Sequence, residues 1–242
     1  MLKYTGKRLL ASVLTLLIIL TVVFVLMRQM PIEGYFDNFD KVDKAVVNAK
    51  LRQLGLLDPI WVQLKNFYAS LLRGDLGISN RYAVGVPIGS VIVSKAPVSI
   101  QMGLMSMALS LLAGIPLGAQ MARSKSKFWD KLGTGFIVFI NAVPAAVYYI
   151  YLQSYGSSAM NIPMLFDYSK PVTWILPVVS MSLGSIAYYA MWLRRYMVDE
   201  INKDYVKLAR AKGVASSRIT MRHVFRNAFV PMIQYIPSSL LF

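Results

Sequence analysis

The side chains that could catalyse a reaction or bind a metal ion are few in this sequence. His223 is the single histidine, and there is no cysteine. A His- or Cys-ligated metal site and a Ser-His-Asp triad therefore have almost nothing to build on. The sequence also lacks the G-x-x-x-x-G-K-[ST] pattern that cradles nucleotide phosphates. If this protein moves a solute against its gradient, we expect the nucleotide chemistry to be on another chain.

A second candidate for chemistry is an acidic cluster of Asp199, Glu200 and Asp204. Three carboxylates near a membrane surface could serve a membrane-embedded enzyme, and this is one alternative hypothesis for the chain. Lys203 and Lys207 stand at helical spacing from these carboxylates, so ion pairs explain the cluster more simply. We therefore predict that this chain is not an enzyme.

The residues around this cluster form the most informative stretch of the sequence. Residues 198–212 are predicted to be one helix, and Gly213 is predicted to end it. Ser216 or Ser217 could cap a second helix that follows. Two short helices joined at a glycine would make a rigid projection from the rest of the chain.

The predicted second helix is strongly basic. Arg218, Arg222 and Arg226 recur every four residues and therefore share one face. Ile219 and Phe225 fall on other faces and could insert into a groove of a partner protein. On the residues alone, the simplest interpretation is a basic hairpin lying on anionic lipid.

The elements that position this stretch follow from the composition. The chain has 242 residues, of which 56% are hydrophobic and only 15% charged, and its mean hydropathy is +0.51. Soluble domains have about 25% charged residues, so a soluble globule and a disordered chain are both disfavoured. The net charge of +15 would suit a nucleic-acid binder, but such proteins are rarely this apolar. We expect a membrane protein that binds no nucleic acid.

Long stretches without a charged residue predict the membrane helices. Spans are expected at roughly 9–27, 98–122, 132–153 and 172–193, because about 20 apolar residues cross the hydrocarbon core. A further span begins near residue 227. The first stretch is interpreted as a retained helix rather than a signal peptide, because it is long and no small-x-small cleavage site follows it.

The basic residues are distributed unequally between the predicted sides of the membrane. If the N-terminus is cytoplasmic, residues 1–8, 123–131 and 194–226 share that side and hold 16 basic and 4 acidic residues. The remaining segments hold 10 basic and 7 acidic residues. The positive-inside rule therefore favours a cytoplasmic N-terminus.

The long segment 28–95 is predicted to be a small helical cap outside the membrane. Asp58 suits an N-cap, Pro59 a first helical position and Gly74 a C-terminal cap. Residues 42–54 are expected to form another short helix.

The predicted spans contain glycine, proline and neutral polar residues but no Asp, Glu, Lys, Arg or His within any complete span. Ion-coupled carriers commonly place an ionisable group there, so a secondary transporter is disfavoured. Such residues could either pack helices together or line a path for a polar solute. The candidate pathway residues are Ser106, Asn141, Tyr148, Ser185 and Tyr188.

Several motifs resemble those of ABC importer permeases, in particular the dipeptide, oligopeptide and nickel branch. In the basic stretch the similar residues are Asp204-Tyr205-Val206, Ala209-Arg210-Ala211-Lys212-Gly213, Arg222-His223, Arg226-Asn227-Ala228 and Pro231. Elsewhere they are Leu54-Gly55-Leu56, Asp58-Pro59, Gln63, Leu71-Leu72-Arg73-Gly74-Asp75-Leu76-Gly77-Ile78-Ser79, Pro97, Ser99 and Gly114-Ile115-Pro116-Leu117-Gly118. The resemblance runs along essentially the whole chain.

The resemblance implies a transport subunit that binds no cofactor itself. Its partners would be a second homologous permease, two ATPase subunits that hold ATP and Mg²⁺, an extracytoplasmic solute-binding protein and membrane lipid. The substrate would be a peptide, with nickel chelates as the alternative. The loop at about 197–227 would dock on one ATPase and couple its motion to the spans. The residues expected to do this are Ala209, Arg210, Ala211, Lys212, Gly213, Arg218 and Arg222.

The expected fold is an all-α polytopic bundle of the type I ABC importer permease kind. Residues 1–29 would form the cytoplasmic N-terminus and first membrane helix, 30–95 the extracytoplasmic segment and 96–242 the core bundle. Family members complete a fifth span and add a sixth, so the chain is expected to be truncated within the fifth. The expected location is the bacterial or archaeal plasma membrane.

Overall fold

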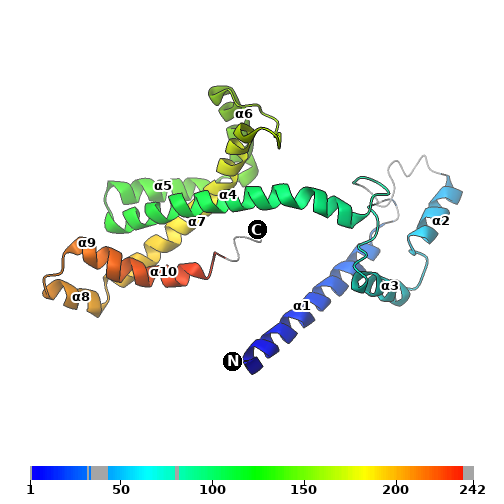
Figure 1. The fold of residues 1–242 in the computed structure, drawn as a ribbon, viewed down its shortest axis with the longest axis horizontal. Coiled ribbons are helices and arrows are strands. Elements are labelled where there is room, and N and C mark those ends of the chain that lie inside the picture. The colour runs from blue at the N-terminus through cyan, green and yellow to red at the C-terminus, as the bar shows by residue number, and fades with distance from the viewer. Residues whose placement is uncertain (1, 32, 34–42, 80–81, 237–242) are drawn as a thin grey trace. The chain divides into compact units, whose positions relative to one another are not determined.

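A computed structural model describes residues 2–31, 33, 43–79 and 82–236 of the chain (Figure 1). Across these ranges the structure is helical and holds no β-strand, only an isolated bridge between Ile78 and Pro87. The chain divides into two compact units, Met1–Lys95 and Ala96–Phe242, which are described separately. The all-α prediction is confirmed.

The first unit is built on α1 (Leu2–Arg28), whose apolar side chains are mostly exposed. Helix α3 (Ile60–Leu72) lies against it. The Tyr68 hydroxyl donates to the Leu17 carbonyl oxygen at 3.0 Å, and the Phe24 and Phe67 rings are 4.9 Å apart. A long helix with exposed leucines and valines is stable where lipid covers it.

The other short helix of this unit is α2 (Lys44–Gln53), and the Asp43 carboxylate caps it by accepting from the Ala45 amide at 2.9 Å. Both predicted helices of segment 28–95 are therefore present. Helix α3 begins one residue later than predicted, with Pro59 rather than Asp58 at the N-cap position. Gly74, at φ +75°, follows its C-terminus as predicted.

Three described helices are long and apolar enough to cross a membrane: Lys3–Arg28 within α1, α4 (Ile88–Arg123) and Pro171–Ile201. The last combines a short 3₁₀-helix, η3 (Pro171–Trp174), with α7 (Ile175–Ile201). They match three of the four predicted spans. The beginning of the further span, near residue 227, lies in a described helix, but residues 237–242 lie outside the described residues.

The span predicted at 132–153 is bent sharply in the structure. Two helices, α5 (Phe128–Ala142) and α6 (Ala145–Met160), meet there at an angle of 104°. The break is at Val143 and Pro144. A proline ring disfavours helical geometry in the residue before it, and Val143 is accordingly extended, with φ −93° and ψ 127°. The pair is therefore a broken span or a re-entrant element.

Helix α7 is the centre of the second unit, and α5, α6 and α10 (Arg226–Ile233) all pack against it (Figure 1). Helix α4 also reaches it closely through Gly114 and Gly118. One apolar cluster joins α4, α5 and α7. Its buried members are Met121, Ile137, Ile140, Ala187 and Ala190. This packing gives α7 contacts along most of its length.

Candidate functional site

The basic stretch folds as a chain of short helical pieces after α7. Helix α8 (Asp204–Ala211) comes first, followed by a turn at Gly213 and the single-turn α9 (Ser216–Arg218). A π-helix, η4 (Ile219–Phe225), then leads into α10. We call residues 202–225 the basic loop.

The predicted single helix over 198–212 is wrong, because the chain breaks between α7 and α8. Asn202 is the last residue in a helical conformation, and Lys203 is extended, with φ −71° and ψ 151°. No glycine or proline marks this break. The turn lets α8 fold back so that Val206 is fully buried.

Gly213 ends α8 as predicted. Its φ of +74° is a left-handed conformation, which costs a residue with a Cβ about 1–2 kcal/mol. The Gly213 amide donates to Arg210 and the Val214 amide to Ala209, so the last carbonyls of α8 are satisfied. A Cβ at Gly213 would have no heavy atom within 4 Å. The glycine is therefore required here by backbone conformation, not by crowding within this chain.

The predicted cap at Ser216 or Ser217 is wrong. Ala215 occupies the N-cap position of α9, and no side chain caps that end. The Ser216 carbonyl oxygen instead accepts from the Thr220 hydroxyl at 2.9 Å.

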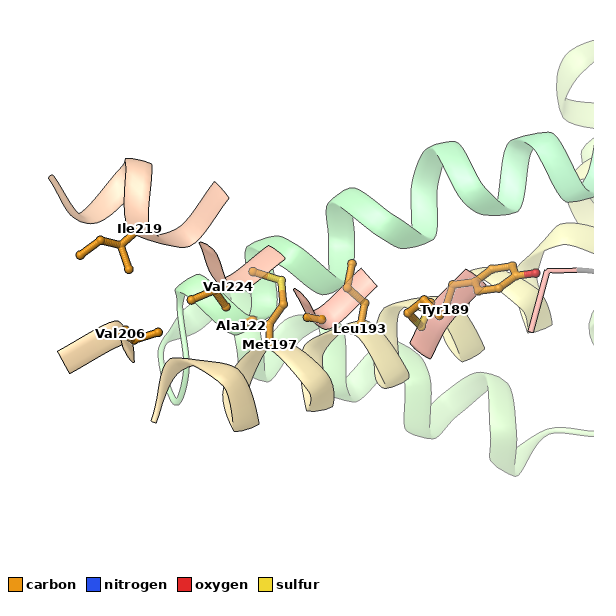
Figure 2. Close-up of a cluster of buried hydrophobic side chains, with 9 residues drawn as sticks. Ala122, Tyr189, Leu193, Met197, Val206, Ile219 and Val224 are labelled. Carbon is orange, nitrogen blue, oxygen red and sulfur yellow. The ribbon is translucent and has the colours of Figure 1, made fainter. Parts of the chain in front are cut away.

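A shared apolar core, which we call the loop core, fixes the basic loop to the ends of α4 and α7 (Figure 2). Its buried members are Ala122, Tyr189, Leu193, Met197, Val206, Ile219, Val224, Ala228 and Met232. Figure 2 shows Val206 and Ile219 at one end of this cluster and Tyr189 at the other. Each large apolar side chain buried in this way contributes about 1.5–3 kcal/mol.

The π-helix explains which residues of the second basic segment are buried. Ile219 and Val224 are five residues apart, are 2% and 0% exposed, and both face the loop core. Five residues are more than one turn of an α-helix but close to one turn of a π-helix. The prediction that Ile219 inserts into a partner is therefore wrong. Phe225 is half-buried, with its ring 5.6 Å from that of Phe229.

The structure places most of the residues predicted to contact the ATPase on one continuous part of the basic loop. Ala209 is half-buried and packs on the loop core. The remaining six are exposed: Arg210, Ala211, Lys212, Gly213, Arg218 and Arg222. The basic loop therefore has a buried apolar side, which packs on the helices, and an exposed basic side.

Tyr205 ties the basic loop to both neighbouring helices, a role that the sequence did not indicate. Its hydroxyl donates to the Glu200 carboxylate of α7 and accepts from the Asn227 side-chain amide of α10 at 3.0 Å. Burial, and then the bond to Glu200, raise the pKa of the Tyr205 phenol above its usual value. Glu200 is therefore bonded to a tyrosine and not to a lysine. An ion pair of the kind predicted for the acidic cluster does form within the described residues, between Asp204 and Lys207 at 2.8 Å.

A partly buried ion pair joins α5 to α7 and was also missed. The Arg194 guanidinium donates to both carboxylate oxygens of Asp130, and its Nη2 atom lies 2.7 Å from Oδ2. The Ser126 amide donates to the same oxygen at 2.7 Å. Asp130 is only 4% exposed, so this network holds a charge that the sequence suggested was in an open loop.

The predicted pathway residues lie on four different helices. Ser106 is buried on α4, Asn141 is exposed on α5, and Ser185 is half-buried on α7. Tyr148 of α6 is half-buried, and its hydroxyl approaches the Cβ position of Gly184 to 3.5 Å. Tyr188 instead packs toward Tyr235, with ring centroids 5.7 Å apart. The two tyrosines therefore contact different neighbours, and the lining role of all five residues stays a prediction.

These features together define a class of protein. Apolar helices long enough to cross a membrane, without a metal-ligating cluster among the described residues, carry a compact basic helical loop. This is the architecture of a multi-pass membrane protein. The chain belongs to the family of binding-protein-dependent transport system inner membrane components, whose model matches residues 114–242. The expected resemblance is thereby confirmed.

Individual relatives cover the chain to different extents. The oligopeptide transport system permease protein AmiC of Streptococcus pneumoniae serotype 4 is 35% identical over 155 residues, which are 63% of this chain and 30% of AmiC. The dipeptide transport system permease protein DppB of Lactococcus lactis is 28% identical over 98% of this chain and 77% of DppB. The oligopeptide transport system permease protein OppB of Haemophilus influenzae is 28% identical over 100% of this chain and 79% of OppB. The chain thus spans less than a third of AmiC and more than three quarters of the other two.

Proposed function

We propose that this chain is a permease subunit of an ATP-driven, solute-binding-protein-dependent importer of peptides. The observation that carries the proposal is the family match over residues 114–242, which contains the whole basic loop. Relatives whose names refer to oligopeptide and dipeptide transport support a peptide substrate. They do not favour the nickel-chelate alternative.

The proposed partners follow from this role. A second homologous permease would complete the membrane path, and two ATPase subunits would bind ATP and Mg²⁺, for which this chain has no phosphate-binding pattern. An extracytoplasmic solute-binding protein would deliver the peptide. The distribution of basic residues supports a cytoplasmic N-terminus in a bacterial or archaeal plasma membrane. The basic loop would then face the ATPases.

The packing of the basic loop supports a role in coupling. A contact surface can transmit motion only if it moves as one body with the helices behind it. Val206 and Ile219 are buried in the same loop core as Met197 and Leu193 of α7. The bonds of Tyr205 to Glu200 and Asn227 add two further attachments. A push on α8 would therefore be passed directly to α7.

Two substitutions at one position test this proposal. Gly213→Ala and Gly213→Trp impose the same left-handed backbone on a residue with a Cβ, but only tryptophan adds bulk to the proposed docking face. We expect Gly213→Trp, in the assembled transporter reconstituted in liposomes, to abolish uptake of a labelled dipeptide while ATP hydrolysis persists. Gly213→Ala should retain most of the uptake.

The controls for this test are assembly and insertion. Both variants should copurify with the second permease and appear in the membrane at wild-type levels. Unchanged dipeptide uptake by Gly213→Trp would refute the coupling role of this loop. Copurification of the wild-type chain without any ATPase would refute the transport assignment.

A further inference from the structure

A cavity of about 380 Å³ lies at the base of the basic loop and shares Arg210 with the exposed side that we assign to ATPase contact. It is lined by the end of α4, the α4–α5 loop, the α7–α8 turn, α8, α9 and η4. Its lining residues are Ala122, Arg123, Lys125, Val198, Ile201, Asn202, Arg210, Ser216, Ser217, Ile219, Thr220 and Val224.

The charge of this cavity is positive, and Lys125 also interacts electrostatically with the Asp130 carboxylate. Arg123, Lys125 and Arg210 reach it from three separate elements, and no carboxylate is among its described lining residues. None of the three forms an ion pair with a carboxylate that the structure describes. Gathering three like charges around one cavity costs electrostatic energy. An anion in the cavity would remove that cost.

The cavity also offers neutral hydrogen-bond donors. The Ser216 and Ser217 hydroxyls lie in its lining, whereas the Thr220 hydroxyl and the Asn202 amide already donate to backbone carbonyls. Guanidinium, ammonium and hydroxyl donors together match the oxygens of a phosphate group.

The position of the cavity indicates where such a group would come from. Arg123 is the last residue of α4 and Ile201 the last of α7, and both helices are long and apolar enough to cross a membrane. The helix ends of a membrane protein lie at the level of lipid headgroups. Apolar side chains, including Val198, Ile201 and Val224, form the other part of the lining.

We propose that this cavity binds the phosphate group of an anionic phospholipid headgroup through Arg123, Lys125 and Arg210. The acyl chains would extend along the apolar surface of the spans. Free inorganic phosphate shares the same chemistry and is the other source to be separated by experiment. The proposal does not depend on which solute the transporter carries.

The test uses the full chain in a neutral detergent and two probes, short-chain phosphatidylglycerol and inorganic phosphate, with short-chain phosphatidylcholine as the zwitterionic control. Binding is measured by titration calorimetry. We expect saturable binding of phosphatidylglycerol and weaker or no binding of phosphatidylcholine. The triple variant Arg123→Gln, Lys125→Gln, Arg210→Gln should lower the affinity by about tenfold or more.

A matched variant separates a specific site from general attraction to a basic surface. Lys127→Gln, Lys131→Gln, Arg222→Gln removes the same charge from exposed positions outside the cavity and should leave the affinity within about twofold of wild type. Equal losses in both triple variants, or no saturable binding of either anionic probe, would overturn the proposal. Saturable binding of inorganic phosphate alone would support the cavity as a phosphate site and reject the lipid as its source.

A second variant keeps the test decisive if the triple variant of Arg123, Lys125 and Arg210 does not fold. Ser217→Glu keeps all three cations and places a carboxylate in the lining of the cavity. It should abolish binding of phosphatidylglycerol while circular dichroism and gel filtration stay as in wild type. Unchanged binding by a folded Ser217→Glu protein would also overturn the proposal.

Discussion

A Cβ atom built on Gly118 of α4 would stand 2.6 Å from the carbonyl oxygen of Ala190 on α7. The Ala190 Cα would be 3.0 Å away, so the obstacle is backbone and not a side chain that could rotate aside. This contact fixes how closely the two membrane helices approach. Interfaces between membrane helices commonly depend on small residues in this way.

Replacing this glycine should therefore destabilise the helix pair. We expect Gly118→Ala to lower the free energy of unfolding by about 1–3 kcal/mol, because a helix must move to admit the methyl group. Gly103→Ala is the control on the same helix, since a Cβ there has no heavy atom within 4 Å. Thermal unfolding in detergent measures both. A stable Gly118→Ala protein would show that α4 and α7 are not held at this distance.

The buried pair of Asp130 and Arg194 provides a second prediction. Arg194→Ala leaves a nearly buried carboxylate without its bidentate partner and should cost about 3 kcal/mol. The double variant Asp130→Ala, Arg194→Ala should be more stable than the sum of the single losses predicts. Chemical unfolding of the four proteins of this cycle gives the coupling energy.

The control for this cycle is the pair of Lys170 and Asp167, whose side chains are exposed. Lys170→Ala should change the free energy of unfolding by less than about 1 kcal/mol, because exposed pairs contribute little. Similar losses in Lys170→Ala and Arg194→Ala would contradict the special role of the buried pair.

The two bonds of Tyr205 predict a stability effect that depends on pH. Tyr205→Phe should lower the free energy of unfolding by about 1 kcal/mol near pH 8. The pKa of Tyr205 is raised in the folded protein, so its protonated form is the one that folding favours. This contribution is fully present below the unfolded pKa of about 10 and is lost as the pH rises through the folded pKa.

Unfolding curves of wild type and Tyr205→Phe at pH 8 and above pH 10 test this prediction. The difference between the two proteins should shrink at the higher pH. Tyr155→Phe is the control, because Tyr155 is exposed. A difference that grows with pH would show that the tyrosinate, not the phenol, is favoured in the folded loop.

Val206 and Leu208 of α8 should separate the stability of the basic loop from its docking. Val206 is 0% exposed and Leu208 is 56% exposed. Val206→Ala should lower the melting temperature of the isolated chain, through the loss of about 1–3 kcal/mol. Leu208→Ala should leave the melting temperature unchanged and weaken copurification of the proposed ATPase partner. The reverse pattern would mean that α8 does not present the face described here.

The features that could be predicted from the sequence are those that depend on a short, continuous stretch of residues. Charge-free stretches identified the three long helices, and Gly213 was recognised because a left-handed residue at a helix end is usually glycine. The angle of 104° between α5 and α6 has no such local signal, because it depends on how each of the two helices packs on α7.

The features that the sequence did not predict depend on partners far away in the chain. Asp130 and Arg194 are 64 residues apart, and only the approach of α5 to α7 brings the two charges together as a partly buried pair. Ile219 is buried because the π-helical turn directs both Ile219 and Val224 into the loop core. A π-helix is rare and has no simple sequence signal, so this turn was not predicted.

The loop core also sets an order of events during synthesis. It brings Ala122 together with Met232, so the site that buries Ala122 is incomplete until a further 110 residues have been made. At about 5–20 residues per second, this interval lasts roughly 5–20 seconds. The long helices can enter the bilayer during that time, whereas the basic loop reaches its final packing only after Met232 has been made. Its apolar residues therefore stay accessible to proteases and chaperones throughout that interval.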